Sequence, residues 1–69
     1  MPYVNIRITR EGDTTKAQKA ALIRGVTELL ADVLDKDPET TFVVIDEVEL
    51  ENWGIGALPV EEYRRAKRE

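Results

Sequence analysis

The feature that most constrains the fold is the order of apolar patterns along a chain of only 69 residues. In residues 2–10, Val4, Ile6 and Ile8 alternate with polar or mixed residues, and this period of two predicts a strand with one apolar face. Residues 40–48 contain the continuous run Phe-Val-Val-Ile, which is typical of a strand covered on both faces. Two strands are therefore predicted, one near each end of a long intervening segment.

A long amphipathic helix is predicted between these strands, over residues 16–35. Leu22, Val26, Leu29 and Val33 follow the spacing that places apolar side chains on one helix face. A strand, a helix and a strand in this order favour parallel strands joined by a right-handed crossover. The predicted fold class is therefore α/β (of the α+β type), as a single β-α-β unit.

Chain length also bounds the assembly. A second core has no room, so residues 1–69 are expected to form one domain. A lone β-α-β unit leaves sheet edges and one sheet face open, and copies that join their edges would form a larger sheet by dimerisation. The apolar area that so small a chain can bury roughly offsets the entropy of ordering it. Because the chain has no cysteine for a disulfide, we expect a homo-oligomer.

Two further segments follow the second strand. Residues 53–56 read Trp-Gly-Ile-Gly and predict a Gly-rich aromatic turn. Residues 60–69 are dominated by charged residues and predict a charged tail, which we expect to be partly ordered at best.

Composition excludes several classes of function. Without Cys or His, the chain has no thiol nucleophile, no imidazole base and no Cys/His zinc site. Its 10 Lys and Arg against 14 Asp and Glu give a net charge of −4, which argues against a nucleic-acid partner. No apolar run approaches the roughly 20 residues of a membrane span, so no membrane partner is expected. No signal peptide is visible after Met1, and a cytoplasmic location is predicted.

Pro2 is the first candidate for chemistry. If Met1 is removed, Pro2 carries a free secondary amine, which a proline inside the chain does not have. A reference α-amino group titrates near pH ~8, and an apolar pocket lowers that value toward the range of a good general base. The alternative is that Pro2 merely begins a strand, where its missing N–H costs nothing.

Arginines and an aromatic residue are the other candidates. Arg7 and Arg10 could each hold a substrate carboxylate through two hydrogen bonds, or could simply lie on a solvated strand face. Trp53 could form an apolar wall beside a ligand, or could be a buried residue of a hairpin turn.

Together these parts resemble the 4-oxalocrotonate tautomerase family over most of the chain. The resemblance rests on the order and spacing of several short elements. They are the Pro2 start with a strand through Ile8, Gly12 before the helix, Gln18-Lys19, Leu22-Ile23-Arg24, Ile45-Asp46-Glu47 and Trp53-Gly54-Ile55-Gly56.

The resemblance implies both an activity and an assembly. Pro2 would be the catalytic base of an isomerase that interconverts the enol and keto forms of a 2-hydroxydienoate, as in aromatic degradation. Trp53 would occupy the family's aromatic position, usually Phe, which keeps the proline site apolar. Neither a metal nor a cofactor is implied. The family assembles as hexamers, three dimers that each share a four-stranded sheet, with active sites built from several subunits.

This chain departs from the family pattern at two arginines. The best-known members place one arginine just after the first-turn glycine, where this chain has Asp13 and Thr14. They place a second in the second strand, where this chain has Phe42. Arg10 is the best compensating carboxylate binder, ahead of Arg7. Phe42 would make the pocket more apolar, so a monoacid such as an aryl enolpyruvate is the easier substrate.

Two other readings remain open. In one, the protonated amine of Pro2 acts as an acid in a cofactor-independent hydratase or dehalogenase of haloacrylates, with Glu11, Asp13 or Glu47 activating water. In the other, the protein is a non-catalytic oligomeric member of the fold, and a retained Met1 leaves Pro2 as an amide without basicity.

Overall fold

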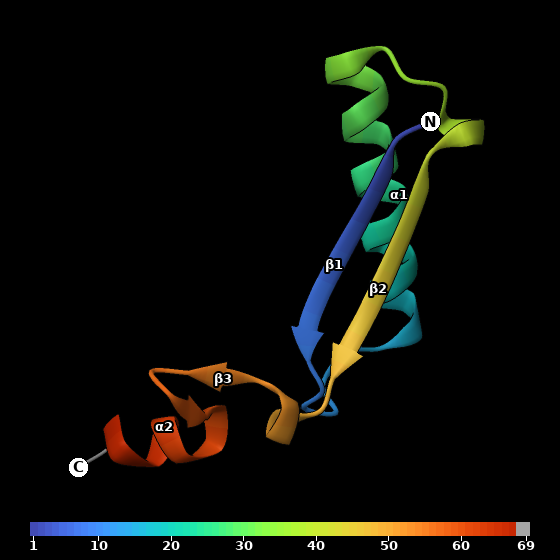
Figure 1. Cartoon of the computed structure of the whole chain (residues 1–69). Coiled ribbons are helices and arrows are strands. Elements are labelled where there is room, and N and C mark those ends of the chain that lie inside the picture. Colours follow the sequence, from blue (N-terminus) through green and yellow to red (C-terminus); the bar gives the residue numbers. More distant parts are fainter. Residues whose placement is uncertain (68–69) are drawn as a thin grey trace.

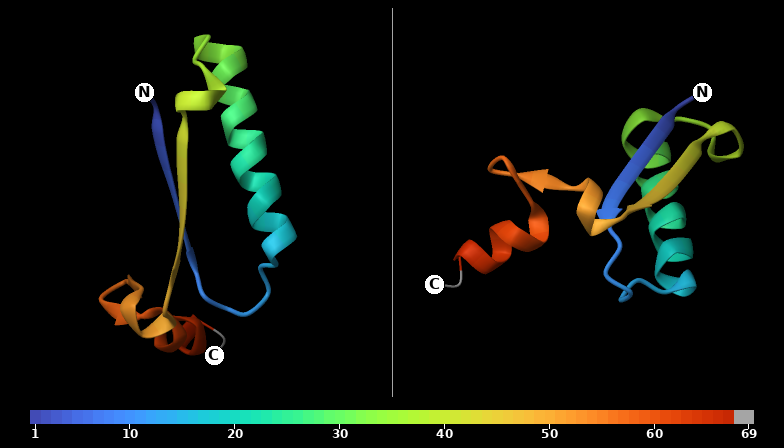
Figure 2. Two further views of the ribbon diagram at one scale, coloured as in Figure 1. Left: turned by 90° about the vertical axis from the view of Figure 1, so that its right-hand side faces the viewer. Right: turned by 60° about the horizontal axis from the view of Figure 1, so that its bottom comes forward.

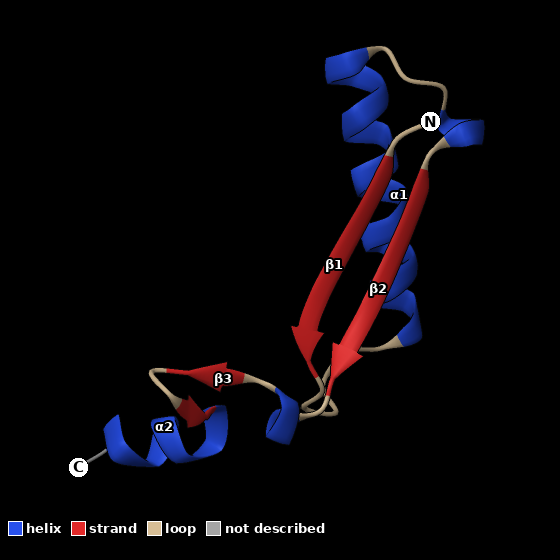
Figure 3. Ribbon diagram, in the orientation of Figure 1, coloured by secondary structure: helices blue, strands red, loops and turns tan. Residues whose placement is uncertain are grey.

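A computed structural model describes residues 1–67 of the chain, and β1, α1 and β2 form the predicted β-α-β unit. Strands β1 and β2 are parallel, with Tyr3 opposite Phe42 and Thr9 opposite Val48. Figures 1 and 3 show α1 lying along this two-stranded sheet. The elements are β1 (Tyr3–Thr9), α1 (Lys16–Leu34), a 3₁₀ turn (Pro38–Thr40), β2 (Phe42–Val48), a second 3₁₀ turn (Leu50–Asn52), β3 (Gly54–Ile55), β4 (Leu58–Pro59) and α2 (Val60–Lys67).

Both ends of α1 are set by local chemistry. At the start, the Thr15 hydroxyl accepts from the Gln18 backbone N–H at 3.1 Å, and the Gln18 side chain accepts from the Thr15 N–H at 2.8 Å. This reciprocal capping box satisfies two N–H groups that the helix cannot pair itself. At the end, Asp35 adopts a left-handed conformation (φ 54°) and stops the helix one residue before the predicted limit.

The sheet has one covered face and one open face. Ile8 and Glu47 lie on the side of α1, where Ile8 shares a groove with the helix and Glu47 accepts a hydrogen bond from Lys19. Strand alternation places Phe42 and Val44 on the opposite side. Seen edge-on, the sheet has α1 on one side only (Figure 2). The expectation that β2 is covered on both faces is thus not met within one chain, where Phe42 is 52% and Val44 41% exposed.

The C-terminal segment is more ordered than we expected. Strands β3 and β4 form a short antiparallel hairpin whose turn residues, Gly56 and Ala57, both have positive φ (59° and 68°). Residues 60–67 then form α2 rather than a loose tail, and the remainder of the expected tail, residues 68–69, lies outside the described residues. Acidic residues in the first turn of α2 and basic residues in its last turn favour the helix through its dipole.

The core of a single chain is very small. Among residues 1–67, Val60 is the only residue that counts as buried, at 7% exposure. The fold is elongated, 48 × 24 × 18 Å, and large apolar side chains of α1, such as Leu29 and Val33, are exposed. Within the same range no helix is long and apolar enough to cross a membrane.

Candidate active site

Pro2 lies at the amino end of β1, where the sheet fixes its carbonyl group. The Phe42 N–H donates to the Pro2 carbonyl oxygen at 2.9 Å, while the nitrogen of Pro2 carries only Met1. Pro2 is half-buried, whereas Met1 is 84% exposed. Removal of Met1 would therefore free the Pro2 nitrogen without removing a packed side chain.

Two aromatic residues lie close to Pro2 along the backbone, because Tyr3 follows it in the chain and Phe42 donates to its carbonyl oxygen. Phe42 and Tyr3 are register partners, and both are exposed. The structure thus places Phe42, one of the predicted site residues, beside Pro2. Tyr3 did not figure among the predicted site residues, although its place in the alternating pattern next to Pro2 was a usable signal.

Arg10 and Trp53 lie at the other end of the sheet. Arg10 follows β1, and at about 3.3 Å per strand residue it is roughly 26 Å from Pro2. Trp53 lies beyond the carboxyl end of β2 and is half-buried. One chain alone therefore does not bring either residue to Pro2. The predicted turn over residues 53–56 is displaced in the structure, because β3 occupies Gly54–Ile55 and the hairpin turn falls at Gly56 and Ala57.

Both candidate arginines already contact carboxylates of the same chain. The Arg10 Nε lies 2.6 Å from a Glu49 oxygen, and its Nη1 lies 3.9 Å from Glu47. Arg7 lies mid-strand on the open face, where its Nε donates to the Asn5 side-chain oxygen at 3.1 Å. It is 3.6 Å from an Asp46 oxygen. Since a guanidinium has five N–H donors, either arginine could keep these partners and still bind a substrate carboxylate.

Two of the three carboxylates proposed to activate water, Glu11 and Glu47, are held as anions. Hydrogen bonds from Arg64 and Thr9 lower the pKa of Glu11 to about 2. A hydrogen bond from Lys19, helped by the charges of Lys19 and Arg10, lowers the pKa of Glu47. A carboxylate with a depressed pKa is a weak base near neutral pH. Neither residue is therefore well suited to activating water.

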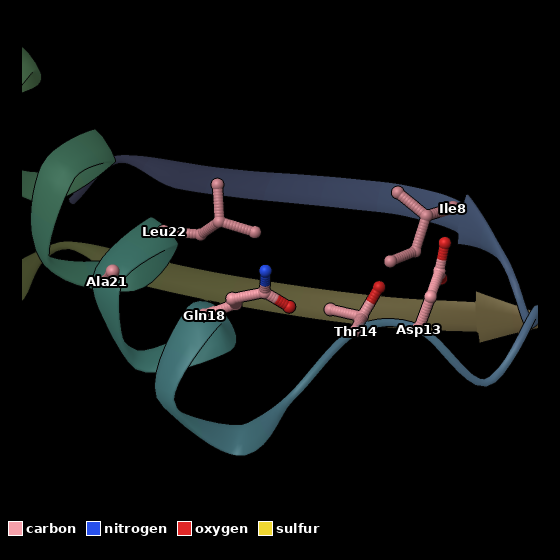
Figure 4. A pocket seen from close by; sticks show the side chains of 6 residues that line it. All are labelled: Ile8, Asp13, Thr14, Gln18, Ala21 and Leu22. Carbon is pink, nitrogen blue, oxygen red and sulfur yellow. The ribbon is translucent and has the colours of Figure 1, made fainter.

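A groove of about 560 Å³ lies between β1 and the start of α1. Figure 4 shows its lining, with apolar side chains from β1 and α1 and polar ones from the loop and first helical turn. Of the residues given a catalytic or binding role from the sequence, Asp13 alone lines it, so the groove is separate from the predicted proline site. Nor does any group of three or more acidic side chains within residues 1–67 stand where it could hold a metal ion. The lining residues are Ile8, Asp13, Thr14, Gln18, Ala21 and Leu22.

One contact in this region could not be found from the sequence. The Arg64 guanidinium of α2 donates to both oxygens of Glu11, at 2.7 and 3.3 Å. The two residues are 53 positions apart, and no local pattern links them.

Comparison of the sequence with known proteins assigns this chain to a protein family. The sequence model of the family described as "Tautomerase enzyme" matches residues 2–63. The chain therefore belongs to the tautomerase family, which confirms the resemblance noted from the sequence.

Particular relatives agree with this assignment. The chain is 60% identical over 65 residues to a "Probable tautomerase K2" of Dickeya dadantii, covering 94% of this chain and 96% of the relative. It is 40% identical over 65 residues to a "2-hydroxymuconate tautomerase" of Pseudomonas sp. strain CF600, covering 94% and 100%. The crystal structure of DmpI from Helicobacter pylori superposes with a TM-score of 0.83 at 38% identity, covering 93% and 97% of the two chains.

Proposed function

We propose that the protein is a cofactor-independent keto–enol tautomerase in which the amine of Pro2, freed by removal of Met1, is the general base. The observation that carries this proposal is the position of Pro2, half-buried and fixed through its carbonyl while its nitrogen bears only an exposed Met1. The relatives, among them a protein named 2-hydroxymuconate tautomerase, support the reaction class.

The proposed step moves one proton and no electrons. The neutral amine of Pro2 takes the proton from the enol hydroxyl, and the negative charge spreads over the enolate. The same nitrogen then returns the proton to carbon, which gives the keto form. Positioned acid–base catalysis of this kind contributes about 10²–10⁴-fold to a rate. Arg10 would hold the substrate carboxylate and so orient the enol.

The proposed site needs more than one subunit. Since Arg10 is roughly 26 Å from Pro2 along β1, the amine of one subunit would meet Arg10 and Trp53 of another. The open sheet face and sheet edges of the β-α-β unit offer surfaces for such an assembly. We propose a homo-hexamer made of three dimers, in which each dimer joins two sheets into one.

The surroundings of Pro2 favour an aromatic monoacid as substrate. Phe42 and Tyr3 are exposed at the amino end of the sheet, where Pro2 lies, and aromatic rings pack well against the aryl group of an aryl enolpyruvate. A 2-hydroxydienoate is the second candidate, in keeping with the name of the Pseudomonas relative. The depressed pKa values of Glu11 and Glu47 count against a hydratase that uses either of them as a base.

The deciding experiment follows ketonisation of phenylenolpyruvate by its ultraviolet absorbance, with protein whose intact mass shows that Met1 is absent. We expect turnover in the wild type and a loss of at least about 10²-fold in Pro2→Ala, because the secondary amine is the base. Pro38→Ala, which alters a proline of the 3₁₀ turn before β2, is the matched control and should keep its turnover. Wild-type turnover no faster than buffer, or full activity in Pro2→Ala, would refute the proposal.

A further inference from the structure

Residues 49–67, which include Trp53, are held near the end of β1 by the side chains of two adjacent residues, Arg10 and Glu11. Arg10 holds the start of this segment through Glu49, at 2.6 Å. Glu11 holds the other end of this segment by accepting two hydrogen bonds from Arg64 of α2, at 2.7 and 3.3 Å. In Figure 1 the segment projects beyond the ends of the strands, away from the bulk of α1. Its placement therefore depends on few contacts.

A short chain of contacts leads from Arg64 to Trp53. Val60 lies one helical turn before Arg64, and its N–H donates to the Trp53 carbonyl oxygen at 2.8 Å. Val60 is also the buried residue of this segment. The ring of Tyr63 packs so closely on Gly56 that a Cβ there would lie 3.0 Å from it. Helix α2 and the backbone around Trp53 therefore form one unit.

The other half of the contact is equally well anchored. Glu11 also accepts a hydrogen bond from the Thr9 hydroxyl, at the end of β1. These hydrogen bonds hold the pKa of Glu11 near 2, so its carboxylate stays charged near neutral pH. Exposed ion pairs usually contribute little to stability, but a bidentate arginine–carboxylate pair fixes geometry as well.

We infer that the Glu11–Arg64 pair is a latch that sets where Trp53 lies relative to Arg10. Glu11 and Arg64 are then positioning residues, since they act on a substrate through Trp53 and do not touch it. The expected effect of the latch on catalysis rests on the proposed function. The expected effect of the latch on the position of Trp53 is independent of that proposal.

Fluorescence tests the latch without any substrate. Trp53 is the only tryptophan, so quenching by acrylamide reports on its exposure alone. We expect a higher quenching constant in Arg64→Ala than in the wild type. Arg64→Lys should have an intermediate constant, because lysine keeps the charge but cannot form the bidentate contact with the carboxylate. Arg65→Ala, next on the same helix, is the matched control and should behave like the wild type. The exchanged pair Glu11→Arg with Arg64→Glu should restore the wild-type value.

Equal quenching in the wild type and Arg64→Ala would overturn the latch, and so would equal effects of Arg64→Ala and Arg65→Ala. The second arm measures ketonisation. We expect a several-fold rise in KM for Arg64→Ala with a smaller change in kcat, and recovery in the exchanged pair. Altered quenching with an unchanged KM would overturn the link to the site. Absence of wild-type turnover would refute the proposed function and leave the quenching result standing.

Discussion

Arg7 and Arg10 have the same charge but different surroundings, and this difference decides which of them suits the proposed site between subunits. Arg7 is engaged mid-strand by Asn5 and Asp46. Arg10 lies past the end of β1, beside the segment that carries Trp53, and is held by Glu49. Of the two, only Arg10 shares its end of the sheet with the predicted aromatic wall.

Arg10→Ala should therefore raise KM for an aryl enolpyruvate more than Arg7→Ala does. A hydrogen bond to a charged group is worth about 1.5–3 kcal/mol, so the rise should be on the order of 10–100-fold. Because the carboxylate is bound alike before and during proton transfer, kcat should change less. Steady-state kinetics of the two variants decide the matter, and a larger KM effect from Arg7→Ala would reverse the assignment.

Glu11 gives the latch a defined pH dependence. Its pKa is lowered from 4.5 to about 2 by hydrogen bonds from Arg64 and Thr9, so the folded state favours the ionised form. The stability that this provides is fully present above the unfolded pKa and is lost as pH falls through the folded value. Glu11→Gln should lower the urea midpoint near neutral pH, and the gap to the wild type should close between pH 4.5 and about 2. A gap that widens on acidification would contradict this cause.

At the scale of elements, Gly56 and Gly25 differ in whether their positions would accept a side chain. Gly56 has a φ of 59°, and a Cβ there would lie 3.0 Å from the ring of Tyr63. Gly25 lies within α1, and a Cβ there would meet nothing within 4 Å. Only the first position therefore requires glycine.

Gly56→Ala should be destabilising by about 1–2 kcal/mol, the cost of a left-handed conformation with a side chain. Gly25→Ala should be stabilising by about 0.5–1 kcal/mol, because alanine loses less backbone freedom in a helix. Urea unfolding of both variants at one protein concentration measures the two effects. A destabilised Gly25→Ala would show that another surface packs closely on that part of α1.

The same scale shows what the sequence could predict. β1 and α1 were predictable because their apolar residues recur with a fixed period, and β2 because it contains a continuous apolar run. Helix α2 was not, since its support comes from Val60, from Tyr63 over the hairpin and from Glu11, which is 53 positions from Arg64.

The candidate site divides in the same way. Pro2 was visible from its place in the sequence and Phe42 from the resemblance, but the hydrogen bond between Phe42 and Pro2 follows only from the parallel register. The separation of Arg10 from Pro2 follows from the length of β1. Which surfaces of other subunits would complete the proposed site depends on contacts between chains, and no local pattern encodes those.

At the scale of the whole molecule, the open face of the sheet is an apolar surface that a single chain leaves uncovered. Val44 is 41% exposed there and lies between Phe42 and the Asn5–Asp46 hydrogen bond. If a second copy covers this face, a charge at its centre would be buried without a partner, which is costly.

Val44→Asp should therefore reduce the protein to smaller species, as measured by sedimentation velocity. Glu28→Lys, which changes charge at an exposed position of α1, should leave the sedimentation coefficient unaltered. Ketonisation should fall in parallel with assembly, because the proposed site needs two subunits. A Val44→Asp protein with the wild-type sedimentation coefficient would show that this face is not a contact.

The pairing of β1 with β2 also affects the rate at which the chain folds. Every pair in it, from Tyr3 with Phe42 to Thr9 with Val48, joins residues 39 positions apart. No rung can form before a loop of that length closes, and such non-local pairing slows folding. Helix α1 needs no such closure, so it can appear first. Once the loop has closed, the lone chain has gained almost no buried core, and the ladder reopens unless another copy arrives. Refolding should thus quicken as protein concentration rises, and the encounter between chains becomes a step of folding itself.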